Sequence, residues 1–246
     1  MSENNVTLLS LDWDTEYFKV PSARVILHHP LSSSEYRTLL DFASTYEFVT
    51  ITNQSDDKMN NRWLGEATTA FLTDVNLQFE MNVTLPQDSD PDTLISSSLP
   101  RDEEIIAIAS SSFRYSRFFN DPYLPQPQAG QIYLNWTKNA FEREDKFFIV
   151  TKRQSHVAGY TLFSIDQKEK KATIELIAVA KDYQGQHVGK SMVDALNRFA
   201  VEHQLQKIHV GTQADNIDGI RFYTRVGFQP VSCASVYHYW PKRIVK

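Results

Sequence analysis

Residues 175–190 combine an apolar strand pattern, a glycine-containing turn and the first turn of an amphipathic helix. The turn contains Gly185 and Gly189, and apolar residues then recur at helical spacing through Met192 and Leu196. The first turn of a helix leaves main-chain N–H groups without intrahelical partners, and the helix dipole adds about half a positive charge there. This segment therefore predicts a site where main-chain donors hold an anion such as a pyrophosphate.

Two familiar nucleotide motifs are missing from the chain. The spacing G-x-x-x-x-G-K-[ST] does not occur, and neither does the full G-x-G-x-x-G with its downstream acidic residue. Nucleotide hydrolysis and hydride transfer are therefore disfavoured. Two glycines alone would fit a tight strand–helix connection without a ligand equally well.

Charge and cysteine content argue against several further classes of protein. The net charge is -5 and the 25 Lys and Arg are dispersed, which argues against a nucleic-acid-binding surface. Cys233 is the only cysteine, so no intrachain disulfide and no structural zinc site with paired thiols are possible. His28 and His29 are strand neighbours that point to opposite faces, so we expect no metal. No secretory signal or apolar window of 18 residues is found, and we expect a cytoplasmic protein.

The apolar patterns predict alternating strands and helices along the whole chain. A stretch at 85–100, rich in Pro, Asp and Ser, marks the expected boundary between an N-terminal α/β domain (1–100), on the substrate side or involved in dimerisation, and a catalytic domain (101–246). Strands are expected at 6–11, 23–27, 48–52, 68–83, 147–151, 158–165, 172–179, 208–211 and 236–240, and helices at 32–44, 103–113, 130–141, 189–203 and 217–226.

Two motifs in the C-terminal part resemble the GNAT acyltransferase superfamily. The acyl-CoA loop of that superfamily reads Q/R-x-x-G-x-G/A, which Gln184 begins and Gly189 ends, with His187 at the usual middle glycine. Residues 216–228 are similar to its N-x-x-A-x-x-x-Y-x-x-x-G-F, with Gly219 in place of alanine. The resemblance implies an α/β (α+β) fold, with a central mixed, mostly antiparallel sheet flanked by helices.

The resemblance also implies acetyl-CoA as co-substrate, without a metal. The strand at 177–179 would pair with the pantetheine amides, the loop would hold the pyrophosphate, and Asn216 would face the thioester. The implied cofactor-binding residues are Ile177, Ala178, Val179, Gln184, Gly185, Gln186, His187, Val188, Gly189, Lys190, Asn216 and Phe222.

Acyl transfer to an amine needs a proton donor for the leaving thiolate and a route for the ammonium proton. By the resemblance, Tyr223 is the general acid, the alternative being a core tyrosine on an amphipathic helix. Glu175 is a candidate base, placed by strand alternation on the face opposite Ile174 and Leu176. A solvent-exposed or salt-bridged Glu175, with a water relay as the base, is the favoured alternative.

Further segments are similar to GNAT proteins of the TDP-fucosamine acetyltransferase group. They are LDWDTEYF at 11–18, SRFFNDP at 116–122 and YLNW at 133–136. This resemblance implies N-acetylation of a nucleotide-linked amino sugar, with Arg117 and Asp121 as candidate substrate-binding residues; the alternative is that both only fix their loop. Trp13 and Phe18 are expected to pack in the core or between domains.

Three functions remain open at this point. The first is an amino-sugar N-acetyltransferase, and the second is an acetyltransferase for another small amine, an amino acid or a protein N-terminus. The third is a degenerate domain that binds acyl-CoA or a partner without catalysis, for which the departures at His187 and Gly219 are the best support. A homodimer is expected only by analogy with such enzymes. The acceptor, the acyl length and the base are not determined by the sequence.

Overall fold

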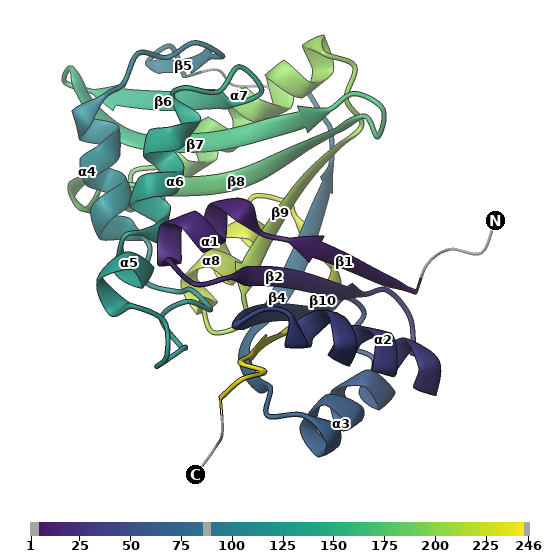
Figure 1. The fold of residues 1–246 in the computed structure, drawn as a ribbon. Helices are drawn as coiled ribbons and strands as arrows, with labels where there is room; N and C mark the ends of the chain where they lie inside the picture. The colour runs from purple at the N-terminus through teal and green to yellow at the C-terminus, as the bar shows by residue number, and fades with distance from the viewer. Residues whose placement is uncertain (1–4, 86–89, 244–246) are drawn as a thin grey trace.

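The strands of the chain form one continuous mixed sheet. In a computed structural model, which describes residues 5–85 and 90–243, the described strands lie in the order β1-β2-β3-β10-β4-β9-β8-β7-β6-β5 (Figure 1). They are β1 (Val6–Ser10), β2 (Ser22–Leu27), β3 (Phe48–Asn53), β4 (Phe71–Asn82), β5 (Thr93–Ser96), β6 (Phe147–Arg153), β7 (His156–Asp166), β8 (Lys171–Val179), β9 (Lys207–Gln213) and β10 (Gln229–Tyr239). Among these described strands, only β2–β3 and β8–β9 pair in parallel. The predicted mixed, mostly antiparallel sheet is confirmed.

Helices cover both faces of this sheet. They are α1 (Asp12–Phe18), α2 (Ser33–Ser44), α3 (Lys58–Ala67), α4 (Glu103–Ser112), α5 (Gln126–Gly130), α6 (Ile132–Ala140), α7 (Val188–Glu202) and α8 (Ile217–Arg225), with a 3₁₀ turn, η1, at Lys181–Tyr183. Figure 1 shows α4 and α6 in front of β6, β7 and β8, with α7 behind them. One buried cluster joins α7 and α8 to the sheet and another joins α4 and α6 to it, so the two faces have separate cores.

Side-chain caps explain where several helices begin. Ser32 and Glu35 form a reciprocal capping box at α2, and Asp57 and Asp102 accept main-chain N–H groups at the starts of α3 and α4. The serine cap of α2 was predicted from the sequence. Helix α3 was not, because its apolar positions are few and Asp57 was not recognised as a cap.

The last described strand, β10, lies inside the sheet and joins its N-terminal strands to the rest. Strand β10 pairs antiparallel with β3 on one side and with β4 on the other, and β4 in turn pairs with β9. The region at 85–100, expected to separate two domains, contains β5, which pairs with β6 at the far edge of the sheet. Residues from the first hundred positions therefore lie directly beside the C-terminal strands.

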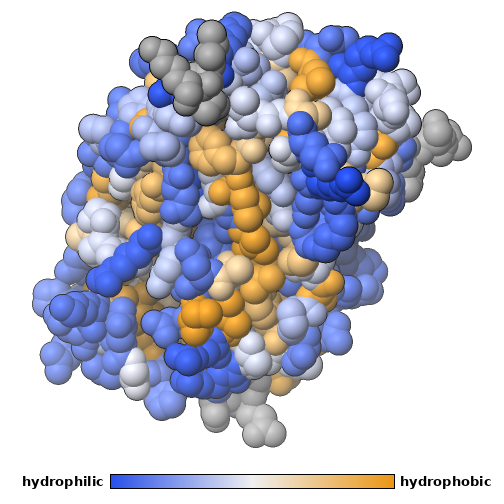
Figure 2. Space-filling model, turned by 90° about the horizontal axis from the view of Figure 1, so that it is seen from below, coloured by the Kyte–Doolittle hydropathy of each residue, from blue (hydrophilic) through white to orange (hydrophobic). Residues whose placement is uncertain are grey.

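The face of the molecule seen in Figure 2 carries mostly polar side chains. Figure 2 shows one strip of apolar side chains, flanked by polar ones, on the face seen from below. No helix among the described residues is long and apolar enough to cross a membrane.

Helix α7 sits on the sheet through a close contact with Gly159 in β7. A Cβ atom on Gly159 would lie 2.8 Å from the Ala178 carbonyl oxygen, 3.0 Å from Val188 Cγ1 and 3.2 Å from Met192 Cε. Val188 is the first residue of α7, and it is buried. The glycine thus lets the N-terminus of α7 approach the end of β8.

We predict that Gly159→Ala destabilises the protein by about 1–3 kcal/mol, because the added methyl group overpacks this contact. The free energy of unfolding in urea measures the effect. Gly65→Ala is the matched control, because Gly65 is exposed within α3 and its added Cβ meets nothing within 4 Å. The control should be stabilising by up to about 1 kcal/mol. Equal effects of the two substitutions would contradict the proposed packing role.

Candidate functional site

Strands β8 and β9 pair for only part of their length. Their parallel pairing runs from Lys171 with Lys207 to Ile174 with Val210, whereas β8 continues to Val179 and β9 to Gln213. Beyond these pairs β8 pairs only with β7, so main-chain groups on its other edge are left for another partner. An extended ligand with amide groups can bind along such an edge.

A β-bulge in β8 marks the point where the strands part. Leu162 pairs with Leu176 while Phe163 pairs with Ile174, which leaves Glu175 as the extra residue. Ile174 belongs to the cluster under α7, and Leu176 belongs to the cluster under α4 and α6. Glu175 lies on the face opposite Ile174, as predicted. Its predicted placement opposite Leu176 was wrong, because the bulge turns Glu175 and Leu176 to the same face.

Glu175 is held in an ion pair. Lys146 Nζ lies 2.5 Å from its Oε1, and Trp136 Nε1 of α6 donates to its Oε2 at 3.2 Å. Only 10% of the Glu175 side chain is exposed. Since both carboxylate oxygens have partners, this geometry matches the salt-bridge alternative given above for Glu175.

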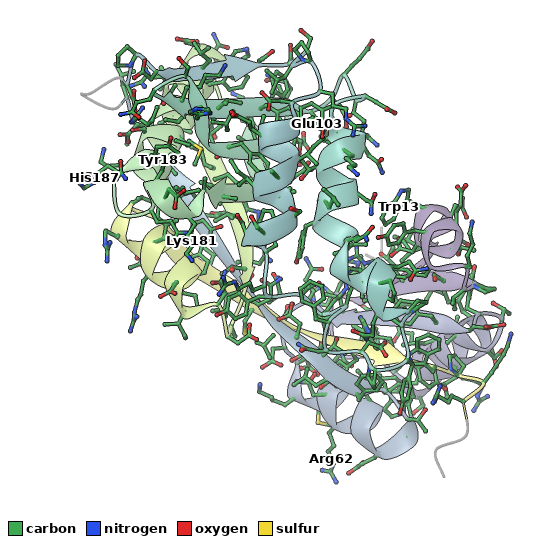
Figure 3. The ribbon with its side chains drawn as sticks, turned by 90° about the vertical axis from the view of Figure 1, so that its left-hand side faces the viewer. Trp13, Arg62, Glu103, Lys181, Tyr183 and His187 are labelled. Carbon is green, nitrogen blue, oxygen red and sulfur yellow. The ribbon has the colours of Figure 1, made fainter. Side chains whose placement is uncertain are left out.

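The loop before α7 presents main-chain donors. Gly185 (φ +77°) and His187 (φ +62°) both have left-handed backbone conformations, and His187 is the N-cap of α7. Side-chain amides brace the loop: Gln184 Nε2 donates to the Val179 carbonyl at 3.3 Å, and Gln186 Nε2 donates to the Asp182 carbonyl at 2.9 Å. Figure 3 shows Lys181, Tyr183 and His187 beside the start of α7.

The N–H groups of this loop lack acceptors. Within the described residues, none of the main-chain N–H groups from 185 to 190 donates to a carbonyl or side chain, and the first intrahelical bond of α7 is that of Ser191 to His187. A turn with alternating backbone handedness followed by a helix N-terminus forms a concave set of donors. The histidine at the middle position of the motif therefore keeps the geometry for which glycine is usual.

Helix α8 packs on the start of α7. A Cβ atom on Gly189 would lie 2.8 Å from Phe222 Cε2, so only glycine allows this approach. At the start of α8, Asn216 Oδ1 accepts the N–H of Gly219 at 3.1 Å, and its Nδ2 donates to Thr212 Oγ1 at 2.9 Å. A Cβ atom on Gly219 would lie 2.4 Å from Asn216 Nδ2, which explains glycine in place of alanine. The Asn216 side chain thus serves as a helix cap here.

Tyr223 lies in the core cluster under α7 and α8. Its ring contacts those of Phe79, Phe222 and Phe228, and 7% of the residue is exposed. No hydrogen bond from its hydroxyl is found within the described part of the chain, and burial raises the pKa of that hydroxyl. Tyr223 therefore keeps its proton at neutral pH and can donate a hydrogen bond.

The two candidate substrate residues have different environments. Asp121 is fully buried, where it accepts hydrogen bonds from His238 Nδ1 (2.7 Å), Trp240 Nε1 (3.0 Å) and the Tyr123 main-chain N–H (2.8 Å). This geometry fixes the loop to β10 and offers nothing to a substrate. Arg117 is half-buried, its guanidinium lies 4.1 Å above the Phe118 ring, and its Nε has no partner among the described residues.

Several charged residues near Arg117 were missed by the sequence analysis. Burial and the like charge of Arg24 lower the pKa of Arg117 to about 10. The negative charges of Asp14 and Asp74 raise this pKa, but by less. Burial and the charge of Asp215 raise the pKa of Asp74 to about 6, although Arg117 lowers it. No motif marks these residues, because they come together only through the order of the strands.

A second missed feature is a surface cavity of about 430 Å³ lined by Trp13, Glu16, Tyr17, Lys19, Asn135 and Asn139. Trp13 does not pack in the core, since it is 42% exposed and its ring stacks on Tyr17 at 4.8 Å. The alternative expectation, that Trp13 packs between domains, stays a prediction. Phe18 is buried, as predicted. Among the described residues, no group of three or more His, Cys, Asp or Glu is arranged to hold a metal ion.

Comparisons with known proteins agree with this geometry. Residues 113–228 match the acetyltransferase (GNAT) family. The chain is 30% identical over 144 residues to the spore coat polysaccharide biosynthesis protein SpsD of Bacillus subtilis (strain 168), covering 58% of this chain and 49% of that protein. It is 28% identical over 83 residues to the probable spermine N(1)-acetyltransferase of Bacillus subtilis subsp. natto (strain BEST195), covering 31% and 55%. The chain thus spans about half the length of these curated relatives.

Among solved structures, a GCN5-related N-acetyltransferase from Sphaerobacter thermophilus superposes with a TM-score of 0.62 at 11% identity, over 99% of this chain and 79% of the other. At 11% identity, this match shows a similar fold and nothing about function. The predicted resemblance to the GNAT superfamily is confirmed by the family match.

The buried carboxylate of Asp121 gives a prediction. Asp121→Ala should lower the free energy of unfolding in urea by about 3 kcal/mol, because buried donors on His238, Trp240 and Tyr123 lose their acceptor. Asp41→Ala, on the exposed side of α2, is the matched control and should change it by less than about 0.5 kcal/mol. A loss below about 1 kcal/mol for Asp121→Ala would show that the loop is held by other contacts.

Proposed function

We propose that the chain is an acetyl-CoA-dependent N-acetyltransferase that acts on a nucleotide-linked amino sugar, because residues 113–228 match the acetyltransferase (GNAT) family. The observation that carries the proposal is the set of main-chain N–H groups from 185 to 190, which lack acceptors and adjoin the unpaired edge of β8. These donors fit a diphosphate, and the strand edge fits the amides of a pantetheine arm. A diphosphate and a pantetheine arm are both parts of an acyl-CoA molecule.

The chemistry requires few side chains. A neutral amine attacks the thioester carbonyl, and the departing thiolate is stabilised by a hydrogen-bond donor. We assign this donor to the protonated hydroxyl of Tyr223, whose helix packs directly on the start of α7 through Phe222 and Gly189. Asn216 then has a positioning role, because its amide fixes the start of that same helix.

An amino sugar carrying phosphate groups fits the acceptor side. Arg117 and Arg24 each have a buried Nε without a partner among the described residues, and neither has a carboxylate oxygen within 4.0 Å. Phosphate is a preferred partner of such guanidinium groups. The relative SpsD is named for polysaccharide biosynthesis, which supports a sugar acceptor. Arg24 lies in β2, so residues 1–100 contribute to the acceptor side under this proposal.

A polyamine is the second candidate acceptor, because the other curated relative is named as a probable spermine N(1)-acetyltransferase. Asp14, Asp74 and Asp215 would attract a polycation. The guanidinium groups of Arg24 and Arg117 in the same cluster would repel it, and within the described part of the chain neither has a carboxylate oxygen within 4.0 Å. The charge pattern therefore favours an acceptor that has both an ammonium group and an anionic group.

The proposal is tested by incubating the full chain with acetyl-CoA and either a dTDP-linked 4-amino-4,6-dideoxyhexose or spermine. We expect release of free thiol with one equivalent of N-acetylated nucleotide sugar, detected by mass spectrometry, and negligible acetylspermine. Faster acetylation of spermine would replace the first candidate by the second. Thiol release without any acetylated amine would exclude both acceptors.

The loop provides a control that links transfer to the proposed cofactor site. Gly185→Val places a β-branched residue at φ +77°, which distorts the donor loop. We expect the KM for acetyl-CoA to rise about tenfold, a loss of about 1.4 kcal/mol, with the KM for the acceptor unchanged. Gly130→Ala, which meets nothing within 4 Å, should leave both constants unchanged.

We predict that Tyr223→Phe lowers kcat by about tenfold to a thousandfold with little change in acetyl-CoA affinity, since only the donor to the leaving thiolate is lost. Steady-state kinetics and calorimetric titration with coenzyme A measure the two quantities. Tyr239→Phe, on β10 in the other half of the sheet, is the matched control and should leave kcat unchanged. An unchanged kcat in Tyr223→Phe would remove Tyr223 as the acid.

A further inference from the structure

Asp74 lies where strand β9 ends. The last paired residues of β4 and β9 are Asn76 and Gln213, and the next main-chain bond runs from the Ala214 N–H to the Val75 carbonyl at 2.8 Å. Asp74 therefore extends past β9, beside the connection to α8. That connection carries Asp215 and leads into the helix of Tyr223.

A second β-bulge lies next to Asp74. On β10, Val236 pairs with Asp74 and Tyr237 pairs with Leu72, so Thr73 is the extra residue in β4. Thr73 Oγ1 donates to the Val236 carbonyl at 3.1 Å, and Asn120 Nδ2 donates to the Thr73 carbonyl at 2.8 Å. The loop that carries Arg117 is thus anchored to this bulge. Bulges commonly aim a side chain toward an active site.

Asp74 is half-buried among groups from several elements. Arg117 faces it from the loop after α4, Asp215 from the β9–α8 connection and Tyr133 from α6, while Asn76 of its own strand donates a hydrogen bond. The charges of Arg24 in β2 and Asp14 in α1 act on Arg117. Burial, with the charge of Arg117 as a lesser cause, lowers the pKa of His238 on β10. Burial and Asp215 outweigh Arg117, which raises the pKa of Asp74 to about 6.

No cation neutralises Asp74 directly. Among the described residues, no Lys, Arg or His nitrogen lies within 4.0 Å of its carboxylate, whereas Glu175 is paired with Lys146 at 2.5 Å and bonded to Trp136. A carboxylate that is already paired and hydrogen-bonded is a poor acceptor for a further proton. Asp74, which has no such cation partner among the described residues, is therefore better suited than Glu175 to accept one.

On this basis, and resting on the function proposed above, we propose that Asp74 is the general base that takes the proton from the acceptor's ammonium group. The ammonium gives one proton to the Asp74 carboxylate and becomes a neutral amine. The amine nitrogen forms a bond to the thioester carbon, the carbon–sulfur bond breaks, and the sulfur takes a proton from Tyr223. The amide nitrogen loses its second proton, which returns to Tyr223 through solvent, and Asp74 releases its own proton to solvent.

The arrangement places the two proton-handling groups on opposite faces of the sheet. Tyr223 belongs to the cluster under α7 and α8. Asp74 interacts with Arg117 and Tyr133, which lie on the side of α4 and α6. The unpaired stretch between β8 and β9 lies between these faces. An amine that arrives from the side of α4 and α6 would meet Asp74, and a thiolate that leaves toward α7 and α8 would meet Tyr223.

The decisive experiment is the pH dependence of kcat/KM for the dTDP-linked amino sugar. In the wild type, activity should rise with pH through about 6, because Asp74 must lose its proton before it can act. Asp74→Asn should lower kcat/KM by about a hundredfold to ten-thousandfold and abolish this acid limb. Asp74→Asn with a rate within twofold of the wild type, or with the limb intact, would overturn the proposal.

Asp215→Asn gives a second, isosteric test. It removes the negative charge that raises the pKa of Asp74, so the acid limb should move to lower pH. A limb that does not move in Asp215→Asn would count against Asp74 as the titrating group. Glu175→Gln should leave the position of the limb unchanged, and a limb lost in that variant would assign the base to Glu175.

Folding provides the remaining control. Because burial raises the pKa of Asp74 in the folded protein from 3.8 to about 6, this carboxylate lowers the free energy of unfolding as the pH rises from about 4 to about 6, and the full loss remains at higher pH. Asp74→Asn should therefore be at least as stable in urea at pH 8 as the wild type. A slow but stable variant supports the proposal, and a strongly destabilised one contradicts it.

The proposed function and this inference can fail separately. If the wild type acetylates no amino sugar, the proposed function fails. If the wild type acetylates it and Asp74→Asn is equally fast, only this inference fails.

Discussion

The separation of β8 from β9 after four paired residues is the constraint on which the site depends. Inside a sheet, main-chain N–H and C=O groups normally pair with the next strand, because leaving them unpaired costs free energy. Here the chain leaves an edge of β8 without that partner and places an equally unsatisfied helix N-terminus at its end. Such an arrangement is stable only if water or a ligand supplies the missing partners. An acyl-CoA has an anion and a row of amides in the matching order.

Close packing fixes the relative position of these parts. Gly159 brings the start of α7 onto the sheet, and Gly189 brings α8 onto α7. Gly219 makes room for the Asn216 amide that starts α8. Each contact leaves no space for a methyl group, so the donor loop, the strand edge and Tyr223 form one rigid unit. The departures from the usual GNAT motifs are therefore compatible with an intact site.

Much of the fold was predictable because periodicity reports burial directly. Strand β8, helix α7 and the capped start of α2 follow from patterns of apolar residues and one serine. The bulge at Glu175 was not predictable, since alternation assumes unbroken pairing and a single extra residue reverses every later side chain. The proposed role of Asp74 could not be inferred from the sequence for another reason. Its neighbours Arg117 and Asp215 are distant in sequence and meet only because β10 and β9 flank β4.

The proposed acceptor side combines residues that are far apart in the sequence, and bringing their charges together lowers the stability of the fold. Arg24 and Arg117 repel one another, and Asp74 is ionised at neutral pH although burial and Asp215 disfavour its charge. A protein selected only for stability would pair or remove such charges. The loop that carries Arg117 is instead held in place by Asp121, buried beneath His238 and Trp240. Unpaired charges on a rigid support are what a site needs when its ligand brings the opposite charges, an ammonium for the carboxylates and a phosphate for the guanidinium groups.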